Sequence, residues 1–304
     1  MKFFQNARLK GENSFISFVF AVLTIVGFYI LTSVPFTLYS IIQGFTSDDM
    51  ATYQGPLTFA LVLFVFSGIL IGVLVATRTI HKRPVLSVLT GATSFRWKHL
   101  IKAVALWFFI LLVMEVVGYI SSPELYTFQF DPIPFFLALI VGLLILPLQT
   151  SAEEVLIRGY LMQQVGLLTR YPWIPVVVTS LLFGMLHGAN PEVEQYGMVK
   201  SMFLYIGMGL FFGVVTVMDD GLEIPLGMHF INNFFAFLIV GYEGSVFGGV
   251  PSLFMKESED LTWLAVATNL AIMVIVLIIL KKYFKWPSFN LLLRRMDDAE
   301  SSLT

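Results

Sequence analysis

Several ionisable or amide-bearing residues lie inside apolar stretches of this chain. Glu153 and Glu154 are adjacent, His187 lies in a later stretch, and His229 is followed at position i+4 by Asn233. An ionisable group inside a membrane-spanning helix costs about 2.5–3.5 kcal/mol on insertion scales, so each one needs a reason to be there. A desolvated carboxylate suits a general base, and an amide can donate to a developing negative charge. These residue types therefore indicate acid–base chemistry.

The two glutamates are predicted to have different roles. Glu154 and Arg158 stand at i and i+4 on the predicted helix, with the glutamate on the N-terminal side, which is the better order for a helical ion pair. Glu153 is rotated by about 100° on the helix and has no such local partner. We therefore expect Glu154 and Arg158 to form a structural pair and Glu153 to be free for chemistry.

The composition indicates which elements position these residues. The chain has 304 residues, of which 57% are hydrophobic and 12% charged, and its mean hydropathy is +0.84. Soluble domains carry about 25% charged residues. A soluble fold and disorder are therefore excluded, and the net charge of −2 argues against a nucleic-acid partner. With no cysteine, disulfides and thiolate metal sites are excluded too.

The fold class predicted is all-α, a polytopic transmembrane bundle of about eight spans. The expected spans are roughly 15–43, 56–77, 101–121, 133–157, 173–190, 200–217, 222–242 and 261–280. With the N-terminus in the cytoplasm, 16 of the 18 basic residues fall in inner loops and tails, and only Lys200 and Lys256 fall outside. This asymmetry predicts that both termini are cytoplasmic. The expected outer loops are acidic, with Asp48, Asp49, Glu124, Asp131, Glu192, Glu194, Glu243, Glu257, Glu259 and Asp260.

Counting along the helices places the candidate residues at one depth. Glu153 lies 18 residues before Tyr171 in the predicted hairpin turn, and His187 lies 16 residues after it. Antiparallel helices rise equally per residue, so these two side chains are expected at nearly the same level. His229 lies seven residues into the seventh span, with Asn233 on the same face one turn deeper. Three helices therefore contribute to one layer near the cytoplasmic side.

Together these motifs resemble a known family. Glu153-Glu154-xxx-Arg158, Phe183-xxx-His187 and His229-xxx-Asn233 occur in that order on successive apolar segments. The pattern is similar to that of the CPBP or Abi family, which includes the CaaX prenyl endopeptidases and enzymes related to bacteriocin processing. The resemblance covers residues 133–242 and makes them a four-helix catalytic core. Residues 1–132 then form a three-span N-terminal region, and residues 243–304 form an outer loop, the eighth span and a basic cytoplasmic tail.

The resemblance implies an intramembrane endopeptidase. Glu153 and His187 would activate water, and His229 and Asn233 would hold the oxyanion, with Phe183 packing one turn from His187. Zinc bound by Glu153, His187 and His229 is an alternative, because one glutamate and two histidines can form a zinc site, but the usual His-Glu-x-x-His arrangement is absent. Metal-free activation of water is the preferred interpretation.

The expected substrate is a membrane-embedded or lipidated peptide or protein, and the expected location is a bacterial plasma membrane. A prenylated substrate is not expected there. Two rival functions remain open: a non-catalytic membrane regulator or bacteriocin-immunity partner, and a proton-linked transporter, although no inverted repeat supports the latter. Glu115 has no assigned role, the oligomeric state is undetermined, and His81 and His99 are expected to be ordinary surface residues.

Overall fold

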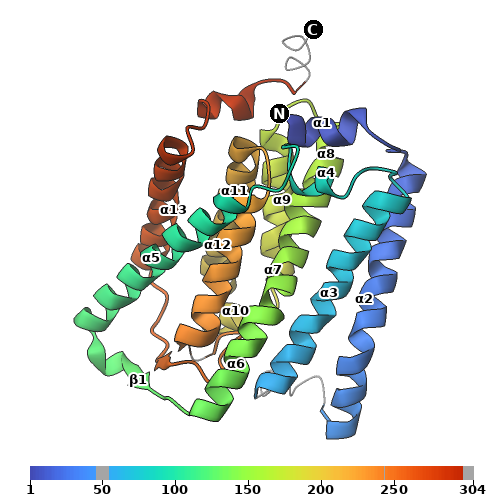
Figure 1. Ribbon diagram of the computed structural model, residues 1–304. Coiled ribbons are helices and arrows are strands. Elements are labelled where there is room, and N and C mark those ends of the chain that lie inside the picture. Colours follow the sequence, from blue (N-terminus) through green and yellow to red (C-terminus); the bar gives the residue numbers. More distant parts are fainter. Residues whose placement is uncertain (46–54, 243, 297–304) are drawn as a thin grey trace.

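The computed structural model describes residues 1–45, 55–242 and 244–296, and these are mostly helical (Figure 1). Asp48, Asp49 and Glu243 of the expected acidic loops lie outside the described residues. The α-helices are α1 (Lys2–Leu9), α2 (Phe15–Gln43), α3 (Pro56–Thr79), α4 (Leu86–Leu89), α5 (Trp97–Ser121), α6 (Pro132–Leu144), α7 (Leu146–Glu154), α8 (Met162–Leu168), α9 (Trp173–Leu186), α10 (Pro191–Tyr196), α11 (Met198–Asp219), α12 (Glu223–Phe234) and α13 (Trp263–Tyr283). The remaining elements are the 3₁₀ turns η2 (Pro123–Leu125) and η5 (Phe289–Leu293), the π-helical turns η3 (Val155–Leu161) and η4 (Phe235–Ile239), and the strands β1 (Tyr126–Phe128), β2 (Val240–Tyr242) and β3 (Phe254–Lys256).

Six helical runs in the described residues are long and apolar enough to cross a membrane, namely α2, α3, α5, the continuous run Pro132–Leu168, α11 and α13. The other two expected spans coincide with shorter elements. Helix α9 has 14 residues and α12 has 12, followed by the five residues of η4. Fourteen residues rise about 21 Å, less than the ~30 Å of a bilayer core. The fold is therefore a polytopic helical membrane bundle, with six full-length candidate spans and two shorter segments.

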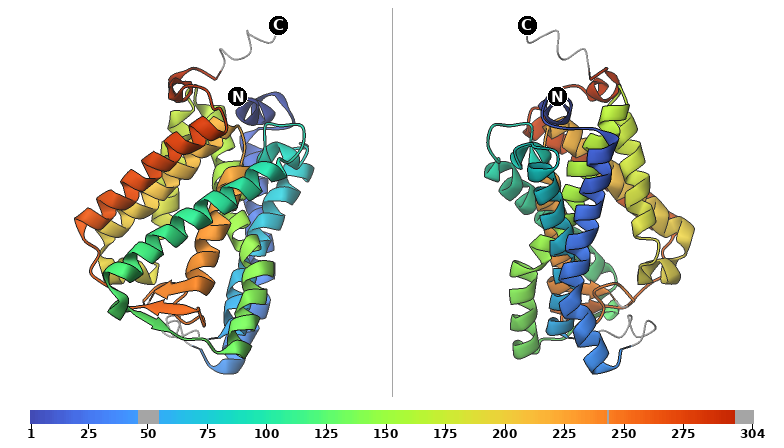
Figure 2. Two further views of the ribbon diagram at one scale, coloured as in Figure 1. Left: turned by 60° about the vertical axis from the view of Figure 1, so that its left-hand side comes forward. Right: turned by 90° about the vertical axis from the view of Figure 1, so that its right-hand side faces the viewer.

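Helix α7 occupies the centre of this bundle. It packs against α3 on one side and α12 on the other, and the π-helical turn η3 that continues it contacts α9. Around it the remaining long helices pack in pairs, α2 with α3, α5 with α12, and α9 with α11 (Figures 1 and 2). The acidic pair of the sequence therefore lies on a helix that others enclose on several sides.

Two of these helix pairs meet through glycines. A Cβ atom on Gly68 would lie 2.3 Å from the carbonyl oxygen of Phe28, and one on Gly72 would lie 2.7 Å from the Cα of Ile25. On α11, Gly209 and Gly213 face α9 in the same way, with Ser180 and Val176 as their neighbours. Small residues let helix backbones approach closely in membranes, so both glycine spacings serve helix packing, as predicted.

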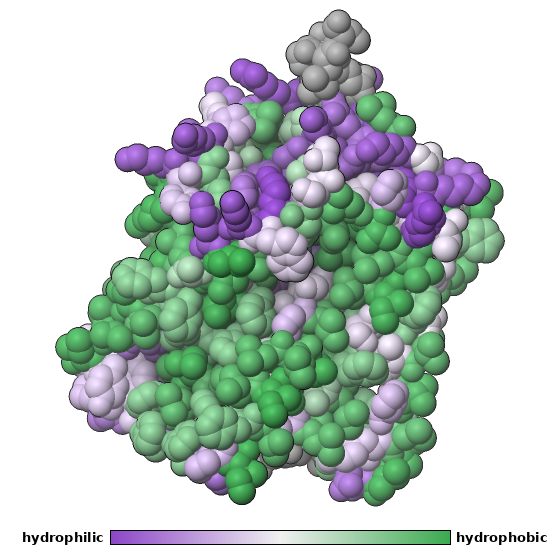
Figure 3. Space-filling model, viewed as in Figure 1, coloured by the Kyte–Doolittle hydropathy of each residue, from purple (hydrophilic) through white to green (hydrophobic). Residues whose placement is uncertain are grey.

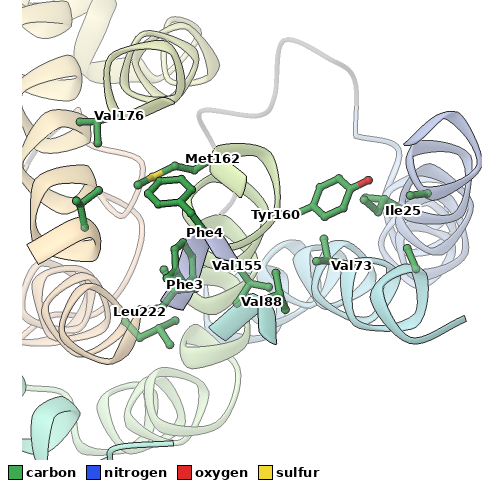
Figure 4. Packing of buried hydrophobic residues seen from close by; sticks show 14 of the residues in the cluster. Phe3, Phe4, Ile25, Val73, Val88, Val155, Tyr160, Met162, Val176 and Leu222 are labelled. Atoms are coloured by element: carbon green, nitrogen blue, oxygen red, sulfur yellow. The ribbon is translucent and has the colours of Figure 1, made fainter. Parts of the chain in front are cut away.

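Hydrophilic residues gather at one end of the molecule, where α1, α4 and η5 lie, above a broad apolar belt (Figures 1 and 3). Helix α1 is built into this end, because Phe3 and Phe4 are buried in a cluster with Val155, Tyr160 and neighbouring residues (Figure 4). The expectation that His81 is a surface residue is wrong, whereas His99 keeps 28% of its side chain exposed. His81 is fully buried and bonds the Tyr160 hydroxyl at 3.0 Å, and burial lowers its pKa.

A small sheet closes the opposite end, and the sequence did not predict it. Its strand order is β1-β3-β2, with β1 antiparallel and β2 parallel to β3. The sheet joins the α5–α6 connection, the end of η4 and the segment before α13 (Figure 2). Glu115 of α5 is fastened to it, because the hydroxyls of Tyr126 and Tyr242 donate to its two carboxylate oxygens. Glu115 thus has a structural role.

Candidate active site

Glu154 ends helix α7 and is completely buried, as is Arg158 one turn later. The Nη1 atom of Arg158 donates to Oε1 of Glu154 at 2.8 Å, so the predicted pair is confirmed. The guanidinium carbon of Arg158 also lies 4.1 Å from the ring centroid of Phe183. Two oppositely charged side chains can be buried together because each offsets the other's loss of hydration.

His229 of α12 connects the two glutamates. Its Nδ1 atom lies 2.8 Å from Oε1 of Glu154, and since a carboxylate oxygen only accepts, Nδ1 carries the hydrogen. Its Nε2 atom lies 3.5 Å from Oε2 of Glu153. The buried Glu154–Arg158 pair therefore fixes the orientation of His229 and leaves Nε2 as the nitrogen available for chemistry.

Glu153 is the more accessible of the two glutamates, with 17% of its side chain exposed. Gln149 lies one turn earlier on α7, and its side-chain amide donates to Oε1 of Glu153. The other oxygen, Oε2, is buried and has no hydrogen-bond partner among the described residues. Oε1 of this carboxylate is thus held in place by Gln149, and Oε2 can accept a hydrogen bond from a ligand or a water molecule.

Asn233 lies on the same face of α12 as His229, as predicted. Its Nδ2 atom is 3.4 Å from Nε2 of His229 and 3.4 Å from Oε1 of Gln149. The amide therefore stands beside the reactive nitrogen of His229 and points its donor into the same small region as the free oxygen of Glu153. This region combines a carboxylate, an imidazole and an amide donor.

His187 stands at the C-terminal end of α9, and its contacts differ from those expected. Its Nδ1 atom donates to the carbonyl of Phe183 at 2.8 Å, and its ring lies between those of Phe183 and Tyr205, at centroid distances of 4.3 and 4.6 Å. Within the described residues, no hydrogen bond or ion pair joins it to Glu153. The Phe183 ring, 6.2 Å from the His229 ring, links the two histidines instead.

Comparison with known proteins identifies a family for this chain. Residues 132–235 match the family model described as type II CAAX prenyl endopeptidase Rce1-like, and this segment contains every residue of the site above. The uncharacterised protein YyaK of Bacillus subtilis (strain 168) is 32% identical over 275 residues, covering 86% of this chain and 91% of that protein. The chain belongs to the Rce1-like family. No solved structure matches it.

Two π-helical turns in this Rce1-like chain adjoin the site, and the sequence analysis missed both. The first, η3, begins directly after Glu154 and contains Arg158, and the second, η4, begins two residues after Asn233. A π turn widens the helix by one residue, and such turns are frequent at functional sites. Here they alter the helical register just beyond each group of polar side chains.

Gln149 was also missed, although its position four residues before Glu153 on the same helix face was a usable signal. Tyr205 offered none, because only the packing of α11 against α9 brings it to His187.

The Rce1-like site does not present a zinc ligand set. In the described part of the chain, no three His, Asp or Glu side chains are grouped closely enough to hold a metal ion. Of the three ligands considered for zinc, Glu153 and His229 are neighbours, whereas His187 donates through Nδ1 to the backbone carbonyl of Phe183. The donor set therefore fits water activation by side chains better than coordination of zinc.

Proposed function

We propose that this protein is an intramembrane endopeptidase that hydrolyses a peptide bond of a membrane-associated protein or peptide. The observation that carries the proposal is the free carboxylate oxygen of Glu153, which is buried, lacks a hydrogen-bond partner among the described residues, and lies 3.5 Å from Nε2 of His229. A buried polar atom without a partner is costly. A water molecule bound at this oxygen removes that cost and becomes the nucleophile.

In the proposed reaction, Glu153 takes a proton from this water while the oxygen atom of the water attacks the carbonyl carbon of the substrate. The resulting oxyanion is stabilised by the amide of Asn233 and by Nε2 of His229 in its protonated form, which Glu154 orients through Nδ1. Glu153 then delivers the proton to the amide nitrogen, and the C–N bond breaks to leave a carboxylic acid and an amine, between which a proton passes to give a carboxylate and an ammonium group.

His187 orients the water in this proposal. Because its Nδ1 hydrogen is engaged by the Phe183 carbonyl, Nε2 keeps a lone pair that can accept the second hydrogen of the water. Phe183 and Tyr205 hold the ring on both faces and limit its rotation. We propose no metal step, because the donor set does not gather around a common point.

The proposal includes the setting of the enzyme. The basic residues of the sequence and the hydrophilic end seen in Figure 3 support a cytoplasmic location of both termini. Helices α9 and α12 with η4 would complete eight membrane-embedded segments. The relative from Bacillus subtilis supports a bacterial plasma membrane. The substrate class is a membrane-embedded or lipidated peptide, with no prenyl group required.

Cleavage can be tested while the substrate is still unidentified. Membranes from bacterial cells that produce the wild-type protein or the Glu153→Gln variant are incubated in H₂¹⁸O, and membrane peptides are analysed by mass spectrometry. Hydrolysis places one ¹⁸O atom in each newly formed carboxylate. We expect labelled C-termini that appear with the wild-type protein and are absent with Glu153→Gln.

Glu115→Gln is the matched control, because it makes the same exchange at another half-buried carboxylate, which Tyr126 and Tyr242 bind beside the small sheet. This variant should give the same labelled products as the wild-type protein. Equal labelling by wild type and Glu153→Gln would reject the proposal. Such a result, with a cellular phenotype that also survives alanine at His229, would favour the non-catalytic regulator.

A further inference from the structure

A chain of side-chain hydrogen bonds runs from helix α5 to the proposed catalytic base. The indole Nε1 of Trp107 donates to Asn232 at 3.2 Å, and Asn232 donates to Oδ1 of Asn233 at 3.3 Å. Asn233 donates to Oε1 of Gln149 at 3.4 Å, and Gln149 donates to Oε1 of Glu153 at 2.5 Å. Four successive bonds therefore join Trp107 to the carboxylate.

The two ends of this chain fix its direction. An indole N–H can only donate, and an ionised carboxylate can only accept. Each amide between them accepts at its oxygen and donates from its nitrogen, so turning over Asn232 or Gln149 would bring two donors or two acceptors together. Successive bonds of one direction polarise one another in a low-dielectric interior. The orientation of Glu153 is thereby coupled to that of Trp107.

Trp107 is one of the two buried residues of α5, with Ala103 one turn before it. Its side chain is 4% exposed and its ring stacks on Phe211 at 5.6 Å. On its cytoplasmic side α5 lies directly on α12, since a Cβ atom on Gly227 would be 2.6 Å from the carbonyl oxygen of Leu100. Beyond Trp107, none of the described residues of α5 is fully buried. Trp107 is thus the last fully buried residue of this helix before Glu115, which binds Tyr126 and Tyr242.

We propose that Trp107 is a positioning residue that holds Glu153 in its reactive orientation through Asn232, Asn233 and Gln149, so that the seating of α5 on α12 sets the competence of the site. The proposal rests on the proposed function, in which Glu153 is the base. Trp107 lies outside the segment 132–235 that the family model matches. The second asparagine of the chain, Asn232, gains a role that its sequence position beside Asn233 does not suggest.

The coupling can be measured without activity. The protein has five tryptophans, so a ¹⁵N-labelled sample in detergent micelles gives five indole N–H signals, and Trp107→Phe identifies that of Trp107. We expect Gln149→Leu, three hydrogen bonds away from Trp107, to shift this signal and speed its hydrogen exchange. The signal of Trp97, on the same helix but 65% exposed, should stay in place. A Trp107 signal that responds to Asn232→Leu but not to Gln149→Leu would overturn the proposal.

The kinetic test follows cleavage of the peptide that the ¹⁸O labelling of wild-type membranes identifies as the substrate. Trp107→Phe keeps the stacked ring but removes the donor, and we expect kcat to fall roughly 3- to 10-fold with KM unchanged, the effect of one hydrogen bond. Asn232→Leu should lower kcat similarly, and the double variant should lose no more than either single one. Trp97→Phe should leave kcat unchanged.

The possible outcomes distinguish failure of the positioning role of Trp107 from failure of the proposed peptidase function. If Glu153→Gln is inactive while Trp107→Phe and Asn232→Leu keep full kcat, the proposed peptidase activity is supported and the positioning role of Trp107 is rejected. If Glu153→Gln cleaves normally, the proposed function is rejected. The nuclear magnetic resonance experiment still tests whether Trp107 and Gln149 are coupled through the hydrogen-bond chain. Should Trp107→Phe fail to fold, Asn232→Leu breaks the same chain with the tryptophan in place.

Discussion

Glu153 and Glu115 are two carboxylates at membrane depth in opposite halves of the molecule, and their surroundings differ in one respect. Both oxygens of Glu115 accept hydrogen bonds, from Tyr126 and Tyr242. Glu153 has one oxygen held by Gln149 and one that is buried without a hydrogen-bond partner among the described residues. A carboxylate with both oxygens satisfied fastens structural elements, whereas a leftover oxygen beside an oriented imidazole is available to a substrate or water.

The difference between Glu153 and Glu115 is tested most clearly by replacing each glutamate with glutamine. Glu153→Gln should lower kcat by about 10²–10⁴-fold, the usual contribution of a general base, with little change in stability. Glu115→Gln should leave kcat unchanged and lower the thermal unfolding midpoint, because one tyrosine hydroxyl then meets an amide. Cleavage assays and thermal unfolding in the same detergent measure both. Similar losses of activity in the two variants would remove the distinction.

Glu154 extends the comparison, because this carboxylate is fully buried and its charge is neutralised by Arg158. Arg158→Leu leaves this carboxylate buried without its cation, so we expect a loss of about 3–5 kcal/mol in the free energy of unfolding. Arg78→Leu, at an exposed position on the end of α3, should change it by less than about 0.5 kcal/mol. Equal stability of these two variants would mean that the pair does not hold the site together.

Asn233 tests the proposed division of labour inside the site. If its amide binds the oxyanion, Asn233→Ala should lower kcat by about 10²–10³-fold while KM changes little, because the interaction forms in the transition state. Asn269 of α13, whose amide donates to the carbonyl of Ala265 within its own helix, supplies the control Asn269→Ala. A rise in KM without a fall in kcat would assign Asn233 to substrate binding instead.

The local parts of this site could be predicted from the sequence, and the tertiary parts could not. The Glu154–Arg158 pair and the shared face of His229 and Asn233 follow from helical spacing alone. The bond between Glu154 and His229 needs the packing of α12 against α7, which no spacing encodes. Counting residues gave an expected depth for His187 but not its ring contacts with Phe183 and Tyr205, so its pairing with Glu153 stays a prediction.

The same limit applies to the outer end. Strands of three residues carry no readable alternation, and the tyrosines that bind Glu115 come from β1 and β2. The division into regions 1–132, 133–242 and 243–304 also stays a prediction. The packing of α1 into the cluster around Val155 shows only that the first region contacts the second.

The smallest expected effect is on stability, when one of the two tyrosine hydroxyls that bind Glu115 is removed. Tyr126→Phe removes one hydrogen bond to Glu115 but keeps the ring over which the Lys256 ammonium lies at 5.0 Å. The free energy of unfolding should fall by about 0.5–1.5 kcal/mol, because the other carboxylate oxygen remains bound by Tyr242. Tyr29→Phe on the exposed face of α2 is the control and should leave stability unchanged. Cleavage should be unaffected by either change. A fall in kcat with Tyr126→Phe would mean that the sheet end communicates with Glu153, and the two carboxylates would then belong to one functional unit.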